Sequence, residues 1–387
     1  MDVLRVYVVF NPDHQVASQW YERLLDSFDC IGMQREGLRF GVPVHRRCQP
    51  WGEARPGLAP ANPRRIDFSH AEWNVVVVLQ DVGLADQQEL WEPYLADVMR
   101  QHQNNEATSW VIPVELGQVN AASLRYLQGI PKRLLTGAPD ERSGRQFFIA
   151  LLNAVLVKMN PPASRHAAGS RYTVFVSHAK RDGSEAAQRV AERLSQVMQR
   201  LGPECFFDVD SLIPGDDYPQ RFEAAIREAS LLALITDTYH ARPWCRWEML
   251  CAKKHGRPVV VAELGRGRIE RSFPYVGNVP TLRLDDSLDE LSNDSIEILI
   301  QALLSESLRV ELWRRLAGGS AGGSAGDKAV LLIRPPELSD IALVAAEHPG
   351  ALRRVLYPDP PLSTEEIDLL QAAFPHIEIL TLSQAIQ

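Results

Sequence analysis

Short apolar runs alternate with helical stripes through the middle of the chain. Apolar residues in segment 187–201 recur every three or four positions, which predicts a helix with one buried face. The brief β-branched and aromatic runs that flank such helices predict buried strands. These runs cover residues 173–177, 205–207, 231–236 and 258–262. Strands that alternate with helices predict an α/β fold with a parallel sheet covered on both faces.

Two stretches of small residues divide the chain. Residues 160–171 are rich in Pro, Ala, Gly and Ser, and residues 318–326 read GGSAGGSAG. Both composition shifts mark domain boundaries, and the second stretch is typical of a flexible linker. We therefore expect three folded parts, residues 1–160, 171–317 and 327–387.

The two flanking parts show the same alternation. Residues 1–160 repeat the strand–helix order of the middle part, which predicts a second α/β domain. Residues 327–387 predict a small β-α-β-α-β unit, in which Ser363 followed by Glu366 predicts a capping box. Because so small a unit buries little apolar surface, we expect it to pack on another domain or subunit.

Composition excludes several classes of protein. The net charge is −8 and the pI about 5.7, which argues against a nucleic-acid binder that relies on a basic surface. No apolar run approaches the ~20 residues of a membrane helix. The N-terminal residues lack the pattern of a signal peptide, so we expect a cytoplasmic protein. The five cysteines show no zinc-type spacing, and we expect reduced thiols and no metal site.

Polar clusters follow three of the predicted strands. Because the carboxyl ends of parallel strands meet at one edge of a sheet, these clusters should converge there. They comprise residues 177–182 after the first strand, 208–218 after the second, and 236–237 with 244–248 after the third.

These clusters carry a family resemblance. The segment YTVFVSHAKRD (172–182) resembles the first box of Toll/interleukin-1 receptor (TIR) domains, and FFDVDSLIPGDDY (206–218) resembles their second box and BB loop. Trp244 to Glu248 matches the W-C-x-x-E signature of catalytically active TIR domains. The resemblance covers about 171–317 and implies a flavodoxin-like TIR domain with a parallel sheet.

The resemblance implies an enzyme that consumes NAD⁺. Catalytic TIR domains are NAD⁺ glycohydrolases, which release nicotinamide with ADP-ribose or a cyclic ADP-ribose isomer. NAD⁺ is then the substrate, and we expect no cofactor. Bacterial members commonly serve antiphage defence, which implies an effector that becomes active when copies assemble.

Glu248 is the expected catalytic residue. Nicotinamide leaves the pyridinium as a neutral molecule and needs little acid catalysis, unlike an alkoxide leaving a sugar. The transition state places positive charge on the ribose, which one carboxylate can stabilise. Trp244 precedes Glu248 by one helical turn, and we expect its ring to stack on the nicotinamide or ribose.

Five more residues are expected to bind the substrate by analogy with the family. Lys180 or Arg181 would meet the diphosphate, and Asp208 would shape the loop that follows it. Tyr218 would lie against adenine, and Ser177 of the first box completes the set.

The Pro-Gly segment of the second box is the expected assembly loop. Ile213, Pro214, Gly215 and Asp216 would dock on a neighbouring copy, because the family tends to build each site from two protomers. The expected partners are therefore NAD⁺, further copies of the chain, and an unidentified activating ligand or protein.

The N-terminal domain departs from the TIR pattern where the chemistry should be. Asn11 and Pro12 stand where Ser-His of the first box would be, and no W-C-x-x-E follows the apolar run 75–79. We interpret residues 1–160 as a divergent TIR-like or flavodoxin-like domain for sensing or assembly, without catalysis.

Alternative interpretations compete with the catalytic one. A glutamate on an amphipathic helix is usually a solvated charge, and Cys251 is interpreted as packing. The chain could act as a non-enzymatic TIR adaptor, although adaptors generally lack the glutamate. A nucleoside deoxyribosyltransferase-like enzyme has a related layout and would form a covalent sugar–carboxylate intermediate.

Overall fold

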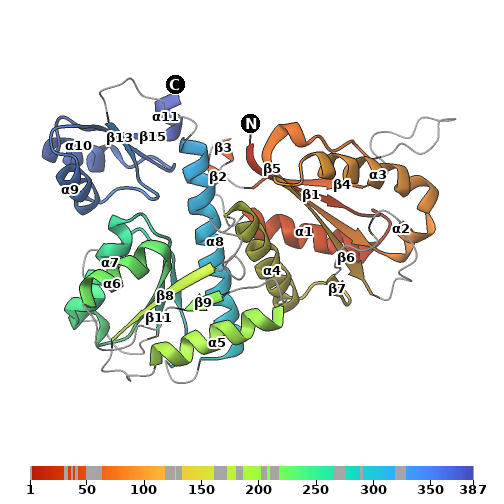
Figure 1. The fold of residues 1–387 in the computed structure, drawn as a ribbon, viewed down its shortest axis with the longest axis horizontal. Helices are drawn as coiled ribbons and strands as arrows, with labels where there is room; N and C mark the ends of the chain where they lie inside the picture. The colour runs from red at the N-terminus through yellow and green to blue at the C-terminus, as the bar shows by residue number, and fades with distance from the viewer. Residues whose placement is uncertain are drawn as a thin grey trace. The chain divides into compact units, whose positions relative to one another are not determined.

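Parallel strands build the sheets of two units, Met1–Gly144 and Arg145–Gln387, in the computed structural model (Figure 1). Both units contain helices that alternate with these strands. The structure describes residues 2–29, 34–35, 38–39, 42–48, 63–117, 127, 133–160, 172–179, 186–201, 207–209, 218–264, 276–287, 291–318 and 328–386. Among the helices within these ranges, none combines the length and apolar character needed to cross a membrane.

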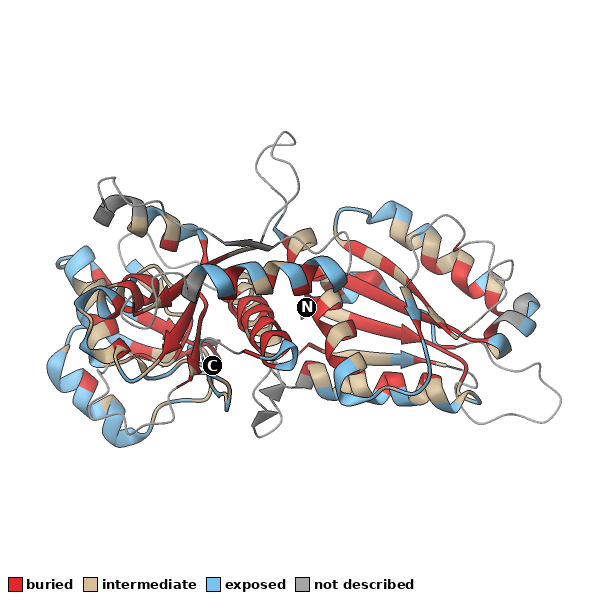
Figure 2. Cartoon of the chain, turned by 90° about the horizontal axis from the view of Figure 1, so that it is seen from below, coloured by how far each residue is buried: buried red, intermediate tan, exposed pale blue. Residues whose placement is uncertain are grey.

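The first unit contains a five-stranded parallel sheet in the order β4-β1-β5-β6-β7. Helix α3 packs on one face, where Trp91 and Leu95 join Tyr7, Val76 and Val78 in the core. The strands of this sheet are largely buried (Figure 2). The elements are β1 (Asp2–Val9), α1 (Gln15–Asp29), β4 (Val44–Arg47), β5 (Ala71–Gln80), α2 (Val82–Asp86), α3 (Gln88–Asn104), β6 (Ser109–Leu116) and β7 (Arg133–Leu135), with a small antiparallel pair β2 (Gln34–Arg35) and β3 (Leu38–Arg39) and the 3₁₀ helix Phe68–His70.

Helix α4 (Glu141–Met159) lies across the division between the units, and most of it belongs with the second unit. Its side chains bond to the long helix α8 (Asn293–Gly318). Arg145 forms an ion pair with Asp294 at 2.9 Å, and Gln146 Nε2 donates to Glu297 Oε1 at 2.8 Å. These contacts join the start of α4 to α8, whereas the predicted N-terminal part extended to residue 160.

The second unit is built around a five-stranded parallel sheet in the order β12-β11-β10-β8-β9. Helices α5 and α8 pack on one face of this sheet, and α6 and α7 pack on the other. The elements are β8 (Tyr172–His178), α5 (Ala186–Leu201), β9 (Phe207–Val209), α6 (Tyr218–Glu228), β10 (Ser230–Ile235), η4 (Tyr239–Ala241), α7 (Pro243–Lys254), β11 (Val259–Glu263) and β12 (Thr281–Arg283).

Both sheets have the same topology. When the five strands of each sheet are numbered along the chain, their order across the sheet is 2-1-3-4-5, which is the flavodoxin-like arrangement. The predicted α/β fold with parallel sheets and interleaved helices is therefore confirmed. In such sheets the strand order reverses beside the first strand, and ligands bind at the carboxyl edge near this point.

A small parallel sheet, β13-β14-β15, forms the C-terminal part of the second unit. The predicted capping box is present: the Ser363 hydroxyl accepts from the Glu366 N–H, and the Glu366 carboxylate accepts from the Ser363 N–H. The Trp313 indole of α8 donates to the Leu332 carbonyl at 2.8 Å, which ties this part to α8. The elements are β13 (Lys328–Leu331), α9 (Leu338–Glu347), β14 (Leu352–Tyr357), α10 (Thr364–Ala373), β15 (Glu378–Thr381) and α11 (Leu382–Ile386).

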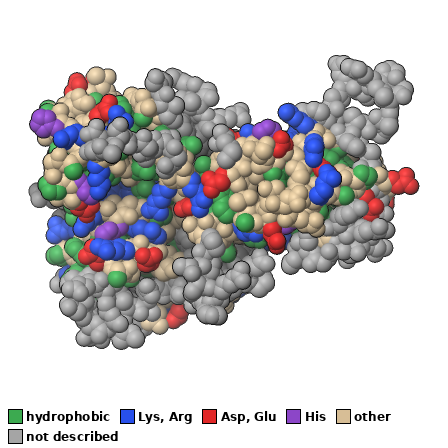
Figure 3. Space-filling view, turned by 45° about the horizontal axis from the view of Figure 1, so that its top comes forward, with side chains coloured by type: hydrophobic (Ala, Val, Ile, Leu, Met, Phe, Trp, Pro, Cys, Tyr) green, Lys and Arg blue, Asp and Glu red, His purple; other side chains and the backbone are tan. Residues whose placement is uncertain are grey.

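Charged side chains of both signs are interspersed on the molecular face in Figure 3. This mixture accords with a chain that has 41 basic and 49 acidic residues.

Candidate functional site

Two elements from distant parts of the sequence meet at the carboxyl edge of the second sheet. Strand β8 brings Ser177 to this edge, on the face that α7 covers. Helix α7 begins with Pro243, whose ring suits the first turn of a helix. It ends in a Schellman motif at Gly256, with a positive φ of 58°. The proline at the first turn and the Schellman motif define the two ends of α7, and so define which of its side chains face the sheet.

Glu248 of α7 is buried at this edge rather than solvated. Its residue exposure is only 8%, so the interpretation as a solvated surface charge is wrong. The Ser177 hydroxyl donates to Glu248 Oε2 at 2.5 Å. A buried carboxylate costs free energy unless it is hydrogen-bonded, and this short bond offsets part of that cost.

Tyr239 extends this hydrogen-bonded pair into a chain. Its hydroxyl lies 2.7 Å from Ser177 Oγ, and because Ser177 donates its proton to Glu248, the tyrosine O–H donates to Ser177. Complete burial raises the pKa of Tyr239 well above its ordinary value, and the negative charge of Glu248 adds to the shift. Tyr239 therefore remains a neutral donor. No sequence pattern singles out Tyr239, although it follows the third predicted strand by only a few residues.

Trp244 presents an aromatic surface beside the start of α7. It is 51% exposed, which is unusual for so large an apolar side chain. Its ring meets Trp247 edge-on with centroids 5.6 Å apart, and lies 6.2 Å from the ring of Phe222 on α6. Neighbouring aromatics thus hold the exposed indole while leaving half of it open to solvent.

Cys245 helps to fix α7 against the sheet. Its buried thiol donates to the His178 carbonyl at 3.4 Å, directly after Ser177 on β8. The contact connects the first turn of α7 to the carboxyl end of β8. Cys245 therefore has a structural role: it helps to hold α7 against β8 close to the Ser177–Glu248 hydrogen bond.

The remaining predicted site residues are placed only in part. The backbone of Asp208 lies within β9, paired with Thr173 of β8, and Tyr218 is the first residue of α6. Lys180 and Arg181 lie outside the described residues. The predicted assembly loop, Ile213, Pro214, Gly215 and Asp216, also lies outside them. Their assigned roles stay predictions.

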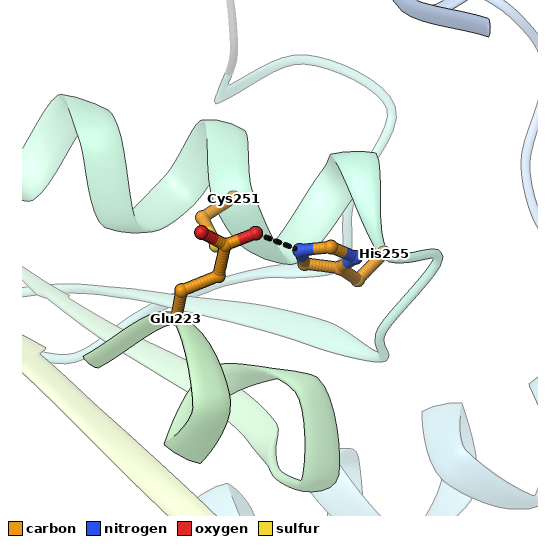
Figure 4. Close-up of side chains that lie close together, drawn as sticks. All are labelled: Glu223, Cys251 and His255. Atoms are coloured by element: carbon orange, nitrogen blue, oxygen red, sulfur yellow. Dashed lines mark hydrogen bonds and ion pairs between the residues drawn. The ribbon is translucent and has the colours of Figure 1, made fainter. Parts of the chain in front are cut away.

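A second cluster of side chains, formed by Glu223, Cys251 and His255, lies between α6 and α7 (Figure 4). Glu223 Oε1 lies 2.9 Å from His255 Nε2 and 3.0 Å from the Arg227 guanidinium. Those two hydrogen bonds lower the pKa of Glu223. Burial, together with the charge of Glu223, raises the pKa of the Cys251 thiol to about 11.

This cluster is not among the groups that the sequence predicts. The sequence predicts a packing role for Cys251, and the cysteine spacings predict no metal site. The available signal was the separation of Cys251 and His255 by four positions, which places both on one helical face. Glu223 joins them only through the packing of α6 on α7, and no local pattern shows that packing.

Comparison with known proteins identifies the middle of the chain. Residues 174–296 match the family model of the TIR domain. This segment begins within β8 and extends past β12, and it holds both Ser177 and Glu248. The candidate site therefore lies within the segment that matches the TIR domain, in agreement with the resemblance of the three boxes. No curated protein matches the chain.

Proposed function

We propose that the chain is a TIR-domain NAD⁺ glycohydrolase in which Glu248 is the catalytic carboxylate. The observation that carries the proposal is the buried Glu248 side chain, held by Ser177 at the carboxyl edge of a parallel sheet. A carboxylate kept out of bulk water interacts strongly with a developing positive charge.

The proposed reaction breaks the bond between the nicotinamide nitrogen and ribose C1′. The bonding electrons move to the pyridinium nitrogen, and nicotinamide departs as a neutral molecule. Positive charge develops on the ribose, where the Glu248 carboxylate stabilises it. Water then bonds to C1′ and loses a proton to solvent, which leaves ADP-ribose. Attack by a nitrogen of the adenine ring in place of water would give a cyclic isomer.

The hydrogen-bonded chain suits this role because it prepares the carboxylate before substrate binds. Ser177 and Tyr239 fix the rotamer of Glu248 through bonds of 2.5 and 2.7 Å. A preorganised charge does not have to reorient as the transition state forms. Ser177 thus acts on the reaction through Glu248, in addition to its predicted contact with substrate.

Substrate binding in this proposal uses groups around the same edge. The exposed Trp244 ring offers a stacking surface for nicotinamide or ribose. Lys180 and Arg181 would bind the diphosphate, and Asp208 and Tyr218 would complete the pocket. TIR domains commonly self-associate, and the proposed assembly contact is the loop Ile213–Asp216, through which copies would activate one another.

Product analysis tests the proposal. Full-length protein is incubated with NAD⁺ at increasing protein concentration, and nicotinamide, ADP-ribose and cyclic isomers are separated chromatographically. We expect equimolar nicotinamide and ribosyl product, with a specific rate that rises as copies assemble. Assembly without nicotinamide release would overturn the proposal in favour of an adaptor. A sugar covalently trapped on Glu248 would favour a deoxyribosyltransferase-like mechanism.

The proposed biological role is an antiphage effector that depletes NAD⁺ in the bacterial cytoplasm or produces a nucleotide signal. Phage infection of cells that express the chain should lower cellular NAD⁺ and reduce phage yield. Protection that persists in an expressed variant without glycohydrolase activity would contradict this role.

A further inference from the structure

Helices α6 and α7 bring three different kinds of metal ligand together on the outer side of the TIR domain. Glu223 extends from α6, and Cys251 and His255 extend from the end of α7 (Figure 4). One carboxylate oxygen, the thiol sulfur and one imidazole nitrogen all lie within 4.8 Å of one another. The Ser177–Glu248 pair does not use these groups.

We propose that Glu223, Cys251 and His255 form a zinc-binding site that joins α6 to α7. Zinc accepts sulfur, imidazole nitrogen and carboxylate oxygen in tetrahedral sites, with bonds of about 2.0–2.3 Å. Ligand atoms in such a tetrahedron are about 3.3–3.8 Å apart. All three atoms lie within 4.8 Å of one another, so metal binding requires side-chain rotations that bring the pairwise separations into this range. Water takes the fourth position.

Access and ligand chemistry both suit a metal ion. The side chains of His255 and Glu223 retain 17% and 32% exposure, so an ion and its water can enter from solvent. Cys251 is buried at the base of the cluster, where its sulfur is shielded from bulk water. As the zinc–sulfur bond forms, the thiol proton is released to solvent. The ion then compensates the charges of the thiolate and the Glu223 carboxylate together.

The positive charge beside the cluster is the Arg227 guanidinium, which lies next to two of the proposed zinc ligands. The guanidinium donates to Glu223 Oε1 at 3.0 Å, and its Nε lies 3.3 Å from His255 Nε2. Both Glu223 Oε1 and His255 Nε2 are proposed zinc ligands, so Arg227 and zinc compete for the space beside them. The arginine is largely exposed and can turn outward into water as zinc enters. Removal of Arg227 should therefore strengthen zinc binding, which a merely structural ion-pair cluster does not predict.

The position of the site couples it to α7. Cys251 follows Glu248 by three residues on the same helix, and Glu223 lies next to Phe222, whose ring packs beside Trp244. A bound ion would hold α6 and α7 together beneath these residues. Zinc binding itself does not depend on the proposed glycohydrolase activity and can be measured without NAD⁺.

Zinc titration of metal-free, full-length protein tests the site. Binding is followed by competition with a chromogenic chelator. We expect one zinc ion per chain, at least about 10-fold weaker binding in Cys251→Ser and in His255→Gln, and tighter binding in Arg227→Gln. Cys48→Ser, a cysteine substitution in the first unit, is the matched control and should bind as the wild type does. Circular dichroism checks that each variant is folded.

Cobalt provides a second readout that identifies the ligand atom. Co²⁺ bound at the site should give a sulfur-to-cobalt charge-transfer band in the wild type and in Cys48→Ser, and no such band in Cys251→Ser. Absence of stoichiometric zinc binding, or equal affinity in the wild type and Cys251→Ser, would overturn the proposal. A cobalt band that survives Cys251→Ser would likewise overturn it.

Discussion

The Ser177 hydroxyl at the end of β8 donates a hydrogen bond to the Glu248 carboxylate, 71 positions later on α7, at 2.5 Å. The bond joins the first strand of the TIR domain to the helix that carries the W-C-x-x-E signature. It fixes the orientation of the only catalytic group that the proposed mechanism requires. The consequences of this arrangement, and of other contacts in the chain, can be measured.

Ser177→Ala should lower kcat for NAD⁺ cleavage by about 10- to 100-fold, because the Glu248 carboxylate then loses a hydrogen bond that fixes its orientation before substrate binds. Steady-state kinetics separates this from a binding defect, since a positioning role reduces kcat more than it raises KM. Ser230→Ala is the matched control: Ser230 is another buried serine of the same sheet, bonded to Ser307 at 3.1 Å. A pure KM effect in Ser177→Ala would assign Ser177 to substrate binding instead.

Trp244→Ala should raise KM for NAD⁺ about 10-fold, since stacking of an aromatic ring on a base contributes about 1–3 kcal/mol. The fold should tolerate the change because half of the side chain is already exposed. Trp247→Ala provides a contrast, because Trp247 packs against the core and its loss should reduce thermal stability. If Trp244→Ala leaves KM unchanged, the indole does not contact the substrate.

Glu337→Gln should loosen the C-terminal part from α7. Lys253 has a side-chain exposure of 1%, and its ammonium bonds to Glu337 at 2.7 Å. Loss of the opposite charge leaves the buried Lys253 ammonium without a compensating charge, although glutamine can still accept its hydrogen bond. The net loss in the stability of this contact should be about 2 kcal/mol. Hydrogen exchange of the α9 amides measures this loss.

The neighbouring pair supplies the control for that change. Lys254 and Glu347 lie 3.5 Å apart and are both substantially exposed. Glu347→Gln should therefore alter the same exchange free energies by no more than about 0.5 kcal/mol. Equal effects of the two substitutions would show that the buried pair does not hold the C-terminal part in place.

Asp81→Asn in the first unit should change how stability depends on pH. Burial raises the pKa of Asp81 above its ordinary value, although His14 and backbone donors oppose the shift. The folded state then keeps the proton to a higher pH than the unfolded state. The stability contributed by the protonated group is complete below about pH 3.8 and is lost as the pH rises through the raised pKa.

The asparagine variant cannot ionise, and it can retain the bond from Leu84 N to the side-chain oxygen. The quantity to compare is the free energy of unfolding of the variant minus that of the wild type. This difference should therefore be larger at about pH 7 than at about pH 4. Urea unfolding at the two pH values, followed by hydrogen exchange of the β5 amides, provides the measurement. The opposite trend would mean that the interaction with His14 outweighs burial.

The sequence predicted the meeting of Ser177 and Glu248 for a physical reason. Short apolar runs located β8, at whose end Ser177 lies, and β10, which Glu248 follows in sequence, and parallel strands bring their carboxyl ends to one edge whatever their separation in sequence. Element ends were less accurate: the first strand was predicted over 173–177 and spans Tyr172–His178, because the polar residue His178 adds nothing to an apolar run.

Contacts that depend on tertiary packing could not be predicted. Tyr239 joins Ser177 through a single turn of 3₁₀ helix, which has no distinctive sequence pattern. Glu337 reaches Lys253 from the C-terminal part, 84 positions later. Strand β12 (Thr281–Arg283) is too short and too exposed to show the alternation of a strand.

Nicotinamide release by Glu248→Gln is the most direct test of the central claim. The substitution preserves the size of the side chain and an oxygen that can accept from Ser177, and removes only the charge. We expect a fall in kcat of more than about 100-fold with self-association unchanged, and wild-type turnover in the matched control Glu228→Gln on α6. Turnover by Glu248→Gln at the wild-type rate would contradict the assignment of Glu248 as the catalytic carboxylate.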